Sequence, residues 1–272
     1  MLCRLMAVDI RVDRTPVWDD LKRIAGGYAG DPRLKLPPKP PQPLPGWPVG
    51  LERDLLIRRL PVLHPKPILL RDPVAAAFRY EDCDTSEHLL ARPPSELAAW
   101  RLWKGLGEGR IGEAELHDLA RLLGGEARIG RHSMVTDRSV SGHRFHFTPA
   151  SEVPARLALL LASLHEAEPA LPPMLHAVGV YLETLLVHPL PDANGRLARL
   201  LFLGSLHRTI GLEAPLYPLG PAIALNREHV LRAYLAWHLD RDPRVLTDFL
   251  LDAVAATREA VADILYRQHK PF

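Results

Sequence analysis

The sequence predicts a mainly α-helical protein with one small β-hairpin, preceded by a proline-rich N-terminal extension. From about residue 95 onward, apolar residues recur three or four positions apart, which is the spacing of a helix that buries one face. A single short stretch, 135–147, favours β-structure instead. Prolines number 27 of 272 residues, about twice the usual ~5 %, and they are concentrated in the first third of the chain. We therefore divide the chain into an extension, residues 1–94, and a helical domain, residues 95–272.

The proline-rich segment of the extension spans residues 36–48. Seven prolines lie between Pro37 and Pro48. Proline lacks a backbone N–H group and has a fixed φ, so this segment neither continues a helix nor lies inside a sheet. We expect an extended polyproline II conformation that serves as a connector or as a strap over the domain. A P-x-x-P ligand for another protein is the alternative interpretation.

The helical domain is expected to begin with two short helices. Ser95 and Glu96 precede an apolar segment as residues at a helix N-terminus do, and Gly105 follows its end. The stretch 112–124 repeats this arrangement. In the stretch 135–147, a Ser-Gly pair is followed by alternating polar and aromatic residues, which is typical of a β-hairpin. Longer helices are expected at 152–168, 172–187, 195–210, 226–239 and 243–268.

The composition argues against several classes of protein. Lys and Arg number 34 and Asp and Glu 32, and this balance gives no support to binding of nucleic-acid phosphates. No stretch of 18 or more apolar residues lacks a charge or a proline, and the N-terminus has no signal-peptide pattern, so we expect no membrane segment. Cys3 and Cys83 form neither a disulfide framework nor a C-x-x-C pair, which favours the reducing cytoplasm.

One segment, residues 188–199, concentrates chemically active groups between two expected helices. Pro189 and Pro191 end the first helix, and the sequence Ala-Asn-Gly forms a tight turn into the second. A helix that begins near Gly195 presents unpaired backbone N–H groups and the positive end of its dipole. Together these features make a binding site for an anion, and phosphate is the obvious candidate.

The side chains of this segment suit phosphate chemistry. Arg196 and Arg199 lie three positions apart in the second helix, where guanidinium groups can hold phosphate oxygens. Asp192 is a hard oxygen ligand for Mg²⁺, and Asn194 can donate its amide to a phosphoryl group. His188, with an ordinary pKa near ~6.5, is placed to take a proton from an incoming hydroxyl. Each residue alone has a common structural explanation, whereas their order and spacing together are far more specific.

This order resembles the signature of the Fic family, His-x-Phe-x-(Asp/Glu)-(Gly/Ala)-Asn-(Gly/Lys)-Arg-x-x-Arg. The single departure is Leu190, which stands where the family has phenylalanine. The phenylalanine anchors the loop in the core, and leucine is expected to keep that anchor with some loss of packing volume. The resemblance extends from about residue 85 to 265. The matching residues are His188, Asp192, Ala193, Asn194, Gly195, Arg196 and Arg199.

The resemblance implies a Fic-like catalytic domain over 95–272, with a helical bundle and a hairpin flap at about 135–147. It implies a Mg²⁺-dependent protein adenylyltransferase, which transfers AMP from ATP to a Ser, Thr or Tyr hydroxyl of a target protein and releases pyrophosphate. The target segment is expected to dock on the flap by main-chain pairing. The implied roles are general base for His188, Mg²⁺ ligand for Asp192, phosphate cradle for Asn194, Gly195 and Arg196, and γ-phosphate contact for Arg199.

Two alternatives to this function stay open. The same loop can transfer another nucleotide or a phosphate, although Gly195 favours adenylylation because a phosphorylating branch of the family has lysine there. Alternatively, the protein is a binding module that keeps the fold without the chemistry. The intact base, carboxylate and arginines argue against that second alternative, because a degenerate site usually loses one of them.

Many members of the family restrain themselves with a motif (Ser/Thr)-x-x-x-Glu-(Gly/Asn), whose glutamate pairs with the second signature arginine. The segment Thr85–Leu90 begins like this motif but has Leu89 at the glutamate position, and residues 247–266 do not contain it. We therefore expect that this motif does not block Arg199 within the chain. The enzyme is then unrestrained or held by a separate inhibitory protein.

Overall fold

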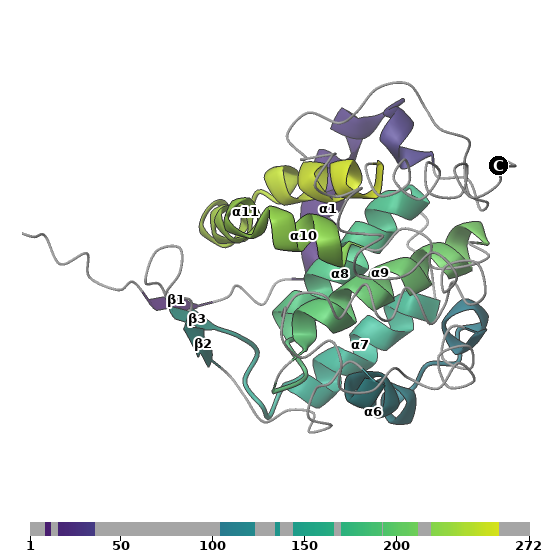
Figure 1. Cartoon of the computed structure of the whole chain (residues 1–272), viewed down its shortest axis with the longest axis vertical. Helices are drawn as coiled ribbons and strands as arrows, with labels where there is room; N and C mark the ends of the chain where they lie inside the picture. The colour runs from purple at the N-terminus through teal and green to yellow at the C-terminus, as the bar shows by residue number, and fades with distance from the viewer. Residues whose placement is uncertain are drawn as a thin grey trace, which may run out of the picture.

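The computed structural model describes residues 9–11, 16–35, 104–122, 134–136, 144–165, 170–191, 193–211 and 219–255 (Figure 1). Several features expected from the sequence lie outside these residues, namely the proline-rich segment 36–48, the segment Thr85–Leu90, the Ser-Gly turn of the hairpin, Asp192, and the continuation of the last helix beyond residue 255. Residues 95–103 of the helix expected after Ser95 also lie outside them, but residues 104–108 are helical, so the helix end expected at Gly105 is wrong.

Two long helices, α8 (Pro173–Val187) and α9 (Asn194–Ile210), lie side by side at the centre of the molecule (Figure 1). Nearly every side chain of α8 is buried, and α9 is buried over most of its length. A helix that is apolar on all sides needs neighbours on all sides. Helices α7 (Val153–His165) and α1 (Val17–Ala25) supply two of these neighbours for α8.

The mainly α-helical fold predicted from apolar spacing is confirmed. The stretch 112–124 forms α6 (Glu113–Leu122), and the stretch 226–239 forms α11 (Arg227–Asp240). Residues 244–255 are helical, as expected for the start of the last helix. The sequence did not lead us to expect α10 (Gly220–Leu225), a short helix opened by a Gly-Pro pair.

The predicted hairpin is also present, and it carries a third strand. Strand β2 (Met134–Thr136) pairs antiparallel with β3 (Arg144–His146), with Val135 opposite Phe145. On the other edge of β3 lies β1 (Asp9–Arg11), which runs parallel to it. This small sheet stands to one side of the helices (Figure 1). Residues of the N-terminal extension therefore complete a sheet that we expected to contain two strands.

Helix α1 packs against α8 through a close approach of Trp18 to Gly179. A Cβ atom on Gly179 would overlap the indole ring of Trp18. The same indole stacks on His176, with ring centroids 5.3 Å apart and planes 18° apart. Glycine inside a helix costs about 1 kcal/mol relative to alanine. The space that Gly179 leaves for the indole ring offsets this cost.

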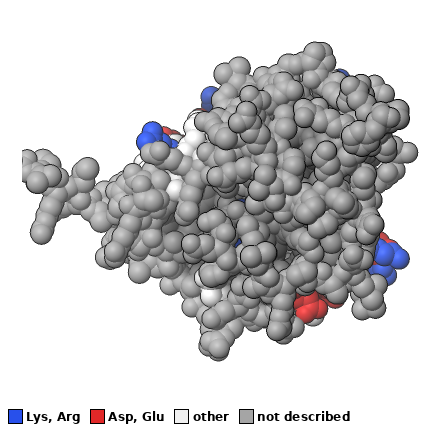
Figure 2. Space-filling view, viewed as in Figure 1, with Lys and Arg blue, Asp and Glu red and all other residues white. Residues whose placement is uncertain are grey.

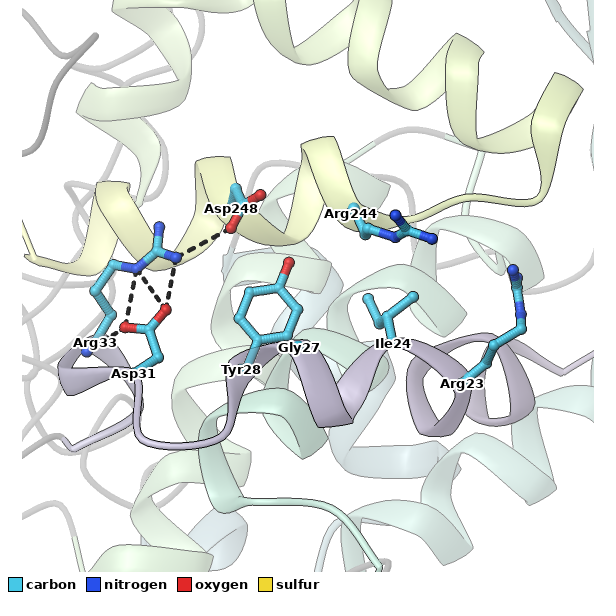
Figure 3. Close-up of a pocket in the computed structure, with 8 residues that line it drawn as sticks. All are labelled: Arg23, Ile24, Gly27, Tyr28, Asp31, Arg33, Arg244 and Asp248. Atoms are coloured by element: carbon cyan, nitrogen blue, oxygen red, sulfur yellow. Dashed lines mark hydrogen bonds and ion pairs between the residues drawn. The ribbon is translucent and has the colours of Figure 1, made fainter.

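A cluster of charges joins the extension to the helical residues 244–255 (Figure 3). Arg33, in the short 3₁₀ helix η2 (Pro32–Leu34), binds both carboxylate oxygens of Asp31, and its guanidinium reaches Asp248 at 3.1 Å and Asp252 at 2.8 Å. The hydrogen bond from Arg33 holds the pKa of Asp31 below its ordinary value. Residues 16–35 are thus attached to the helical body by an apolar contact at one end and by ion pairs at the other.

In the part of the chain that the structure describes, no helix is long and apolar enough to span a bilayer. In Figure 2, the described charged side chains on this face are of both signs and are scattered rather than gathered into one basic patch.

Candidate active site

The connection between α8 and α9 carries the signature residues and begins and ends in left-handed backbone. His188, directly after α8, has φ 49° and ψ 56°, and Ala193, directly before α9, has φ 70°. This conformation costs a residue other than glycine roughly 1–2 kcal/mol, so the surrounding contacts must hold it. The His188 N–H group donates to the Thr184 carbonyl at 2.9 Å, which fixes the first of the two turns. The result is a short, sharply turned connection.

Asn194 fixes the shape of this connection with its side chain. Its Nδ2 donates to the Leu190 carbonyl at 2.7 Å, and its Oδ1 accepts from the Leu190 N–H group at 2.9 Å. Leu190 itself is fully buried, which agrees with the expected anchoring role. We expected the amide of Asn194 to donate to a phosphoryl group; in the structure both of its polar atoms bind Leu190.

The imidazole of His188 is held between the flap and the last turn of α8. Phe147, the residue directly after β3, stacks on it with ring centroids 3.8 Å apart and planes 24° apart. The Nδ1 atom lies 3.4 Å from the carbonyl oxygen of Leu185. In the tautomer whose Nδ1–H points toward this carbonyl, the lone pair on Nε2 can accept a proton. Phe147 is not among the site residues expected from the sequence; its position at the end of the predicted hairpin was the available signal.

A buried network ties the base of the flap to α8, α7 and α1. Thr148 donates its hydroxyl to the Leu186 carbonyl at 2.8 Å, and Arg156 reaches the Thr148 hydroxyl at 3.4 Å. Arg156 also forms an ion pair of 2.8 Å with Glu183, which is only 5 % exposed. The other oxygen of Glu183 accepts from the Val17 N–H group at the start of α1, at 3.3 Å. A buried charge of this kind needs such partners, because an unpaired one is costly.

The sequence contained a signal for this network that we did not use. Glu183 is the only charged residue of α8, whose other residues are mostly apolar and buried. Charged residues are rarely buried unless they are paired. The expected apolar stripe of α8 was correct, but the carboxylate beside it indicated a buried cationic partner. That partner, Arg156, lies 27 residues away in the sequence, so spacing alone does not identify it.

A cavity of about 290 Å³ opens beside the signature residues. His188, Gly195 and Arg199 lie on it, and Arg199 is almost completely buried. Arg196 is partly exposed and does not line this cavity, and Asp192 lies outside the residues that the structure describes. The structure therefore brings together the expected base and the second signature arginine. The remaining wall is mainly apolar and aromatic, formed by Phe147, Tyr181, Leu185, Ile223, Val230, Leu231, Tyr234 and Leu246.

A larger cavity, about 430 Å³, lies between α1, η2 and the helical residues 244–255 and contains no signature residue (Figure 3). Tyr28 stands in it, and burial together with the nearby Asp248 raises the pKa of its phenol, so this side chain stays neutral. The charges around the cavity are largely used to hold the surrounding elements together. The signature residues His188, Gly195 and Arg199 line the smaller cavity instead.

A metal site made of protein ligands alone is absent from the described residues, which include no group of three His, Cys, Asp or Glu side chains suited to one ion. Mg²⁺ bound together with a nucleotide needs fewer protein ligands. It usually takes one or two carboxylates and completes its octahedron with phosphate oxygens and water. The donor chemistry of the segment 188–199, one carboxylate beside a helix N-terminus, fits such an ion.

Comparison with known proteins agrees with this combination of fold and site. Residues 111–206 match the model of the Fic/DOC family, and this range includes the hairpin, α7, α8 and every signature residue. The match supports a Fic domain in this part of the chain. None of the curated proteins compared with the chain matches it.

Three solved structures are similar to this chain. A Fic domain-containing signaling protein from Bacteroides thetaiotaomicron is 17 % identical, with a TM-score of 0.52, over 79 % of this chain and 96 % of that chain. A Fic family protein from Desulfovibrio desulfuricans is 18 % identical, with a TM-score of 0.49, over 94 % of this chain and 75 % of that one. Fic-1 from C. elegans is 16 % identical, with a TM-score of 0.49, over 79 % of this chain and 72 % of that one. At these identities the Bacteroides structure supports the fold and nothing further.

Proposed function

We propose that this protein is an adenylyltransferase that moves AMP from ATP to a Ser, Thr or Tyr hydroxyl of a target protein. The observation that carries the proposal is the arrangement of His188 and Arg199 around one cavity, next to the N-terminal turn of α9. A base and a cation beside unpaired backbone N–H groups are what transfer from a nucleoside triphosphate requires. The Fic domain supports the same class of reaction, because proteins of this family often transfer nucleotides or phosphate.

In the proposed reaction, the target hydroxyl oxygen attacks the α-phosphorus of ATP. The bond from this phosphorus to the oxygen that bridges to the β-phosphate breaks, and pyrophosphate leaves with the bonding electron pair. The hydroxyl proton passes to Nε2 of His188, whose Nδ1 faces the Leu185 carbonyl. The positive end of α9 and the guanidinium of Arg199 stabilise the charge on the departing phosphates. The catalytic contribution is therefore positioning together with charge stabilisation.

We assign the Mg²⁺ ligand to Asp192, the single carboxylate in the segment 188–199. When bound, Mg²⁺ would neutralise phosphate charge and orient the leaving group. Arg196, which is partly exposed in the first turn of α9, is proposed to bind a phosphate from outside the cavity. A cytoplasmic location fits these co-substrates, and a separate protein that covers Arg199 would restrain the reaction.

The test is transfer from labelled ATP by the purified chain to proteins of a cell lysate and to the chain itself. Label on the α-phosphate is expected to appear on protein, while label on the γ-phosphate is expected to leave with pyrophosphate. His188→Ala is expected to lower transfer by ~10²–10⁴-fold, which is the usual contribution of a positioned base. His229→Ala, at an exposed position of α11, is the matched control and should keep full transfer. Transfer of γ-label alone would favour phosphorylation, and full transfer by His188→Ala would refute the proposed mechanism.

A further inference from the structure

The N-terminal strand β1 lies on one edge of the flap strand β3. The two strands run parallel over three residues, with Asp9 beside Arg144, Ile10 beside Phe145 and Arg11 beside His146. The opposite edge of β3 is paired with β2, so both edges of β3 are used. A strand whose two edges are paired has no free N–H and C=O groups to offer to another extended chain.

The edge covered by β1 leads directly to the proposed base. Strand β3 ends at His146, and the next residue, Phe147, stacks on His188. Thr148 then fixes the chain to the last turn of α8. An extended segment paired along β3 is therefore guided toward the imidazole, whereas one paired along β2 lies one strand further away. The β3 edge is the better docking surface for a hydroxyl that must reach His188.

We propose that β1 is an internal occupant of the target-docking edge and that an extended segment of the target protein must take its place on β3. The proposal rests on the proposed function, because it concerns the segment that presents the hydroxyl. The partner it predicts is an extended peptide held by main-chain hydrogen bonds, with little demand on its sequence. The N-terminal strand then limits the reaction until a target displaces it.

The pairing has the strength expected of a replaceable strand. Three paired residues give only a few backbone hydrogen bonds, each with a small net contribution to stability. The short covalent connection between β1 and α1 compensates for this weak pairing. Only four residues separate Arg11 from Pro16, and the next residue, Val17, is held by Glu183. Such a short connection gives β1 an effective concentration on the order of millimolar at the flap, so a target must compete with it.

The experiment uses the full-length chain with Asp9→Pro and Ile10→Pro combined. Successive N–H groups of a strand point to opposite sides, so replacing two neighbouring residues removes at least one of the groups that can donate to β3. Hydrogen exchange at residues 144–148 is the readout, since it does not depend on activity. We expect exchange there to increase at least ten-fold in this variant and to stay unchanged in the control, Leu5→Pro with Met6→Pro. Equal exchange in the variant and in the unchanged protein would overturn the proposal.

A second measurement tests displacement. The probe is a synthetic peptide of residues Ala7–Pro16, which contains the strand sequence and the hydroxyl of Thr15. At millimolar concentration it is expected to restore slow exchange at 144–148 in the double-proline variant. As an acceptor of AMP, it should have a KM at least ten-fold lower with this variant than with the unchanged chain. Faster exchange with an unaltered KM would overturn the docking role of the edge. If neither protein transfers AMP, the proposed function fails, and the exchange data with and without peptide still decide whether β1 is displaced.

Discussion

The ring of Phe147 lies on the imidazole of His188, with centroids 3.8 Å apart, so the base of the flap and the end of α8 meet at the proposed general base. Phe147 arrives from the hairpin, whereas His188 arrives from the central helix. The position of the hairpin base and the orientation of the imidazole are therefore linked.

Replacing Phe147 by leucine tests this contact. Leucine keeps most of the buried apolar volume, so the cost in stability should stay below about 1.5 kcal/mol. The imidazole loses its stacked neighbour and becomes more mobile and better solvated. We expect kcat for AMP transfer to fall about ten-fold, with a smaller change in the KM for ATP, because a misplaced base affects the chemical step.

Phe249→Leu provides the control, because this buried ring meets another histidine, His229, at 5.7 Å, and neither residue lines the cavity. The Phe249→Leu variant should lose as much buried packing as Phe147→Leu and keep the kcat of the unchanged protein. The kinetics of both variants, together with thermal unfolding, separate orientation from stability. Equal kcat values for Phe147→Leu and the unchanged protein would contradict the positioning role.

Glu183→Gln is expected to lower stability while it preserves the size of the side chain. The glutamine can still accept from the Val17 N–H group, but the guanidinium of Arg156 loses its charged partner in a nearly buried position. Breaking a buried pair costs about 3–5 kcal/mol when one charge is left alone. The single amide oxygen of glutamine then stays with Val17 and the NH2 group faces the guanidinium, so a cost in this range is expected.

Combining Glu183→Gln with Arg156→Met tests whether the two side chains are energetically coupled. Removing both charges should cost less than the sum of the two single changes, by at least 1 kcal/mol in a double-mutant cycle. Urea unfolding of the four proteins measures this difference. Additive losses would show that the two side chains do not act as a pair.

Gly179→Ala is expected to disturb the docking of α1, because the new methyl group meets the indole of Trp18. Overpacking of this kind costs about 1–3 kcal/mol. The effect of Gly179→Ala on stability should reverse in sign when Trp18 is first replaced by alanine. In that background the helix propensity of alanine makes Gly179→Ala stabilising by about 1 kcal/mol. Thermal unfolding of the four proteins checks the reversal, and destabilisation of equal size in both backgrounds would exclude the contact as its cause.

Asp31 gives a stability effect that depends on pH. The hydrogen bond from Arg33 lowers the pKa of this carboxyl in the folded protein below its ordinary value of 3.8. The stabilisation is therefore present above this ordinary value and is lost as the pH falls through the lower folded value. Asp31→Asn should cost about 1 kcal/mol near neutral pH, and the difference should vanish in strong acid. Urea unfolding at several pH values measures it, and a constant difference would contradict the ionic origin.

The sequence predicted the helices well because their signal is local. The apolar spacing in 152–168 and 172–187 placed the start of α7 and both ends of α8 within a few residues of their positions in the structure. The hairpin was found for the same reason, since its two strands lie close together in the chain. Strand β1 was missed because it pairs with residues about 135 positions away, and three residues are too few to show a β-pattern.

The sequence predicted which residues belong to the site better than it predicted the contacts that these residues make. The signature identified His188 and Arg199, and the structure places both on one cavity. It did not indicate that the amide of Asn194 closes the loop on Leu190, because a side chain that binds its own loop and one that binds a ligand look alike in a sequence. Phe147 and Glu183 lie outside the signature, and only their places in the fold reveal their contacts.

The contact between Trp18 and Gly179 has a practical consequence for where the chain can be shortened. A recombinant fragment that starts at residue 95 contains the whole signature, but it lacks the indole that fills the notch on α8 and the Arg33 that binds Asp248 and Asp252. It would expose the surface of the central helix around Gly179 and leave two carboxylates without their cation. Such a fragment should be prone to aggregation, and the smallest well-behaved fragment should include residues 16–35.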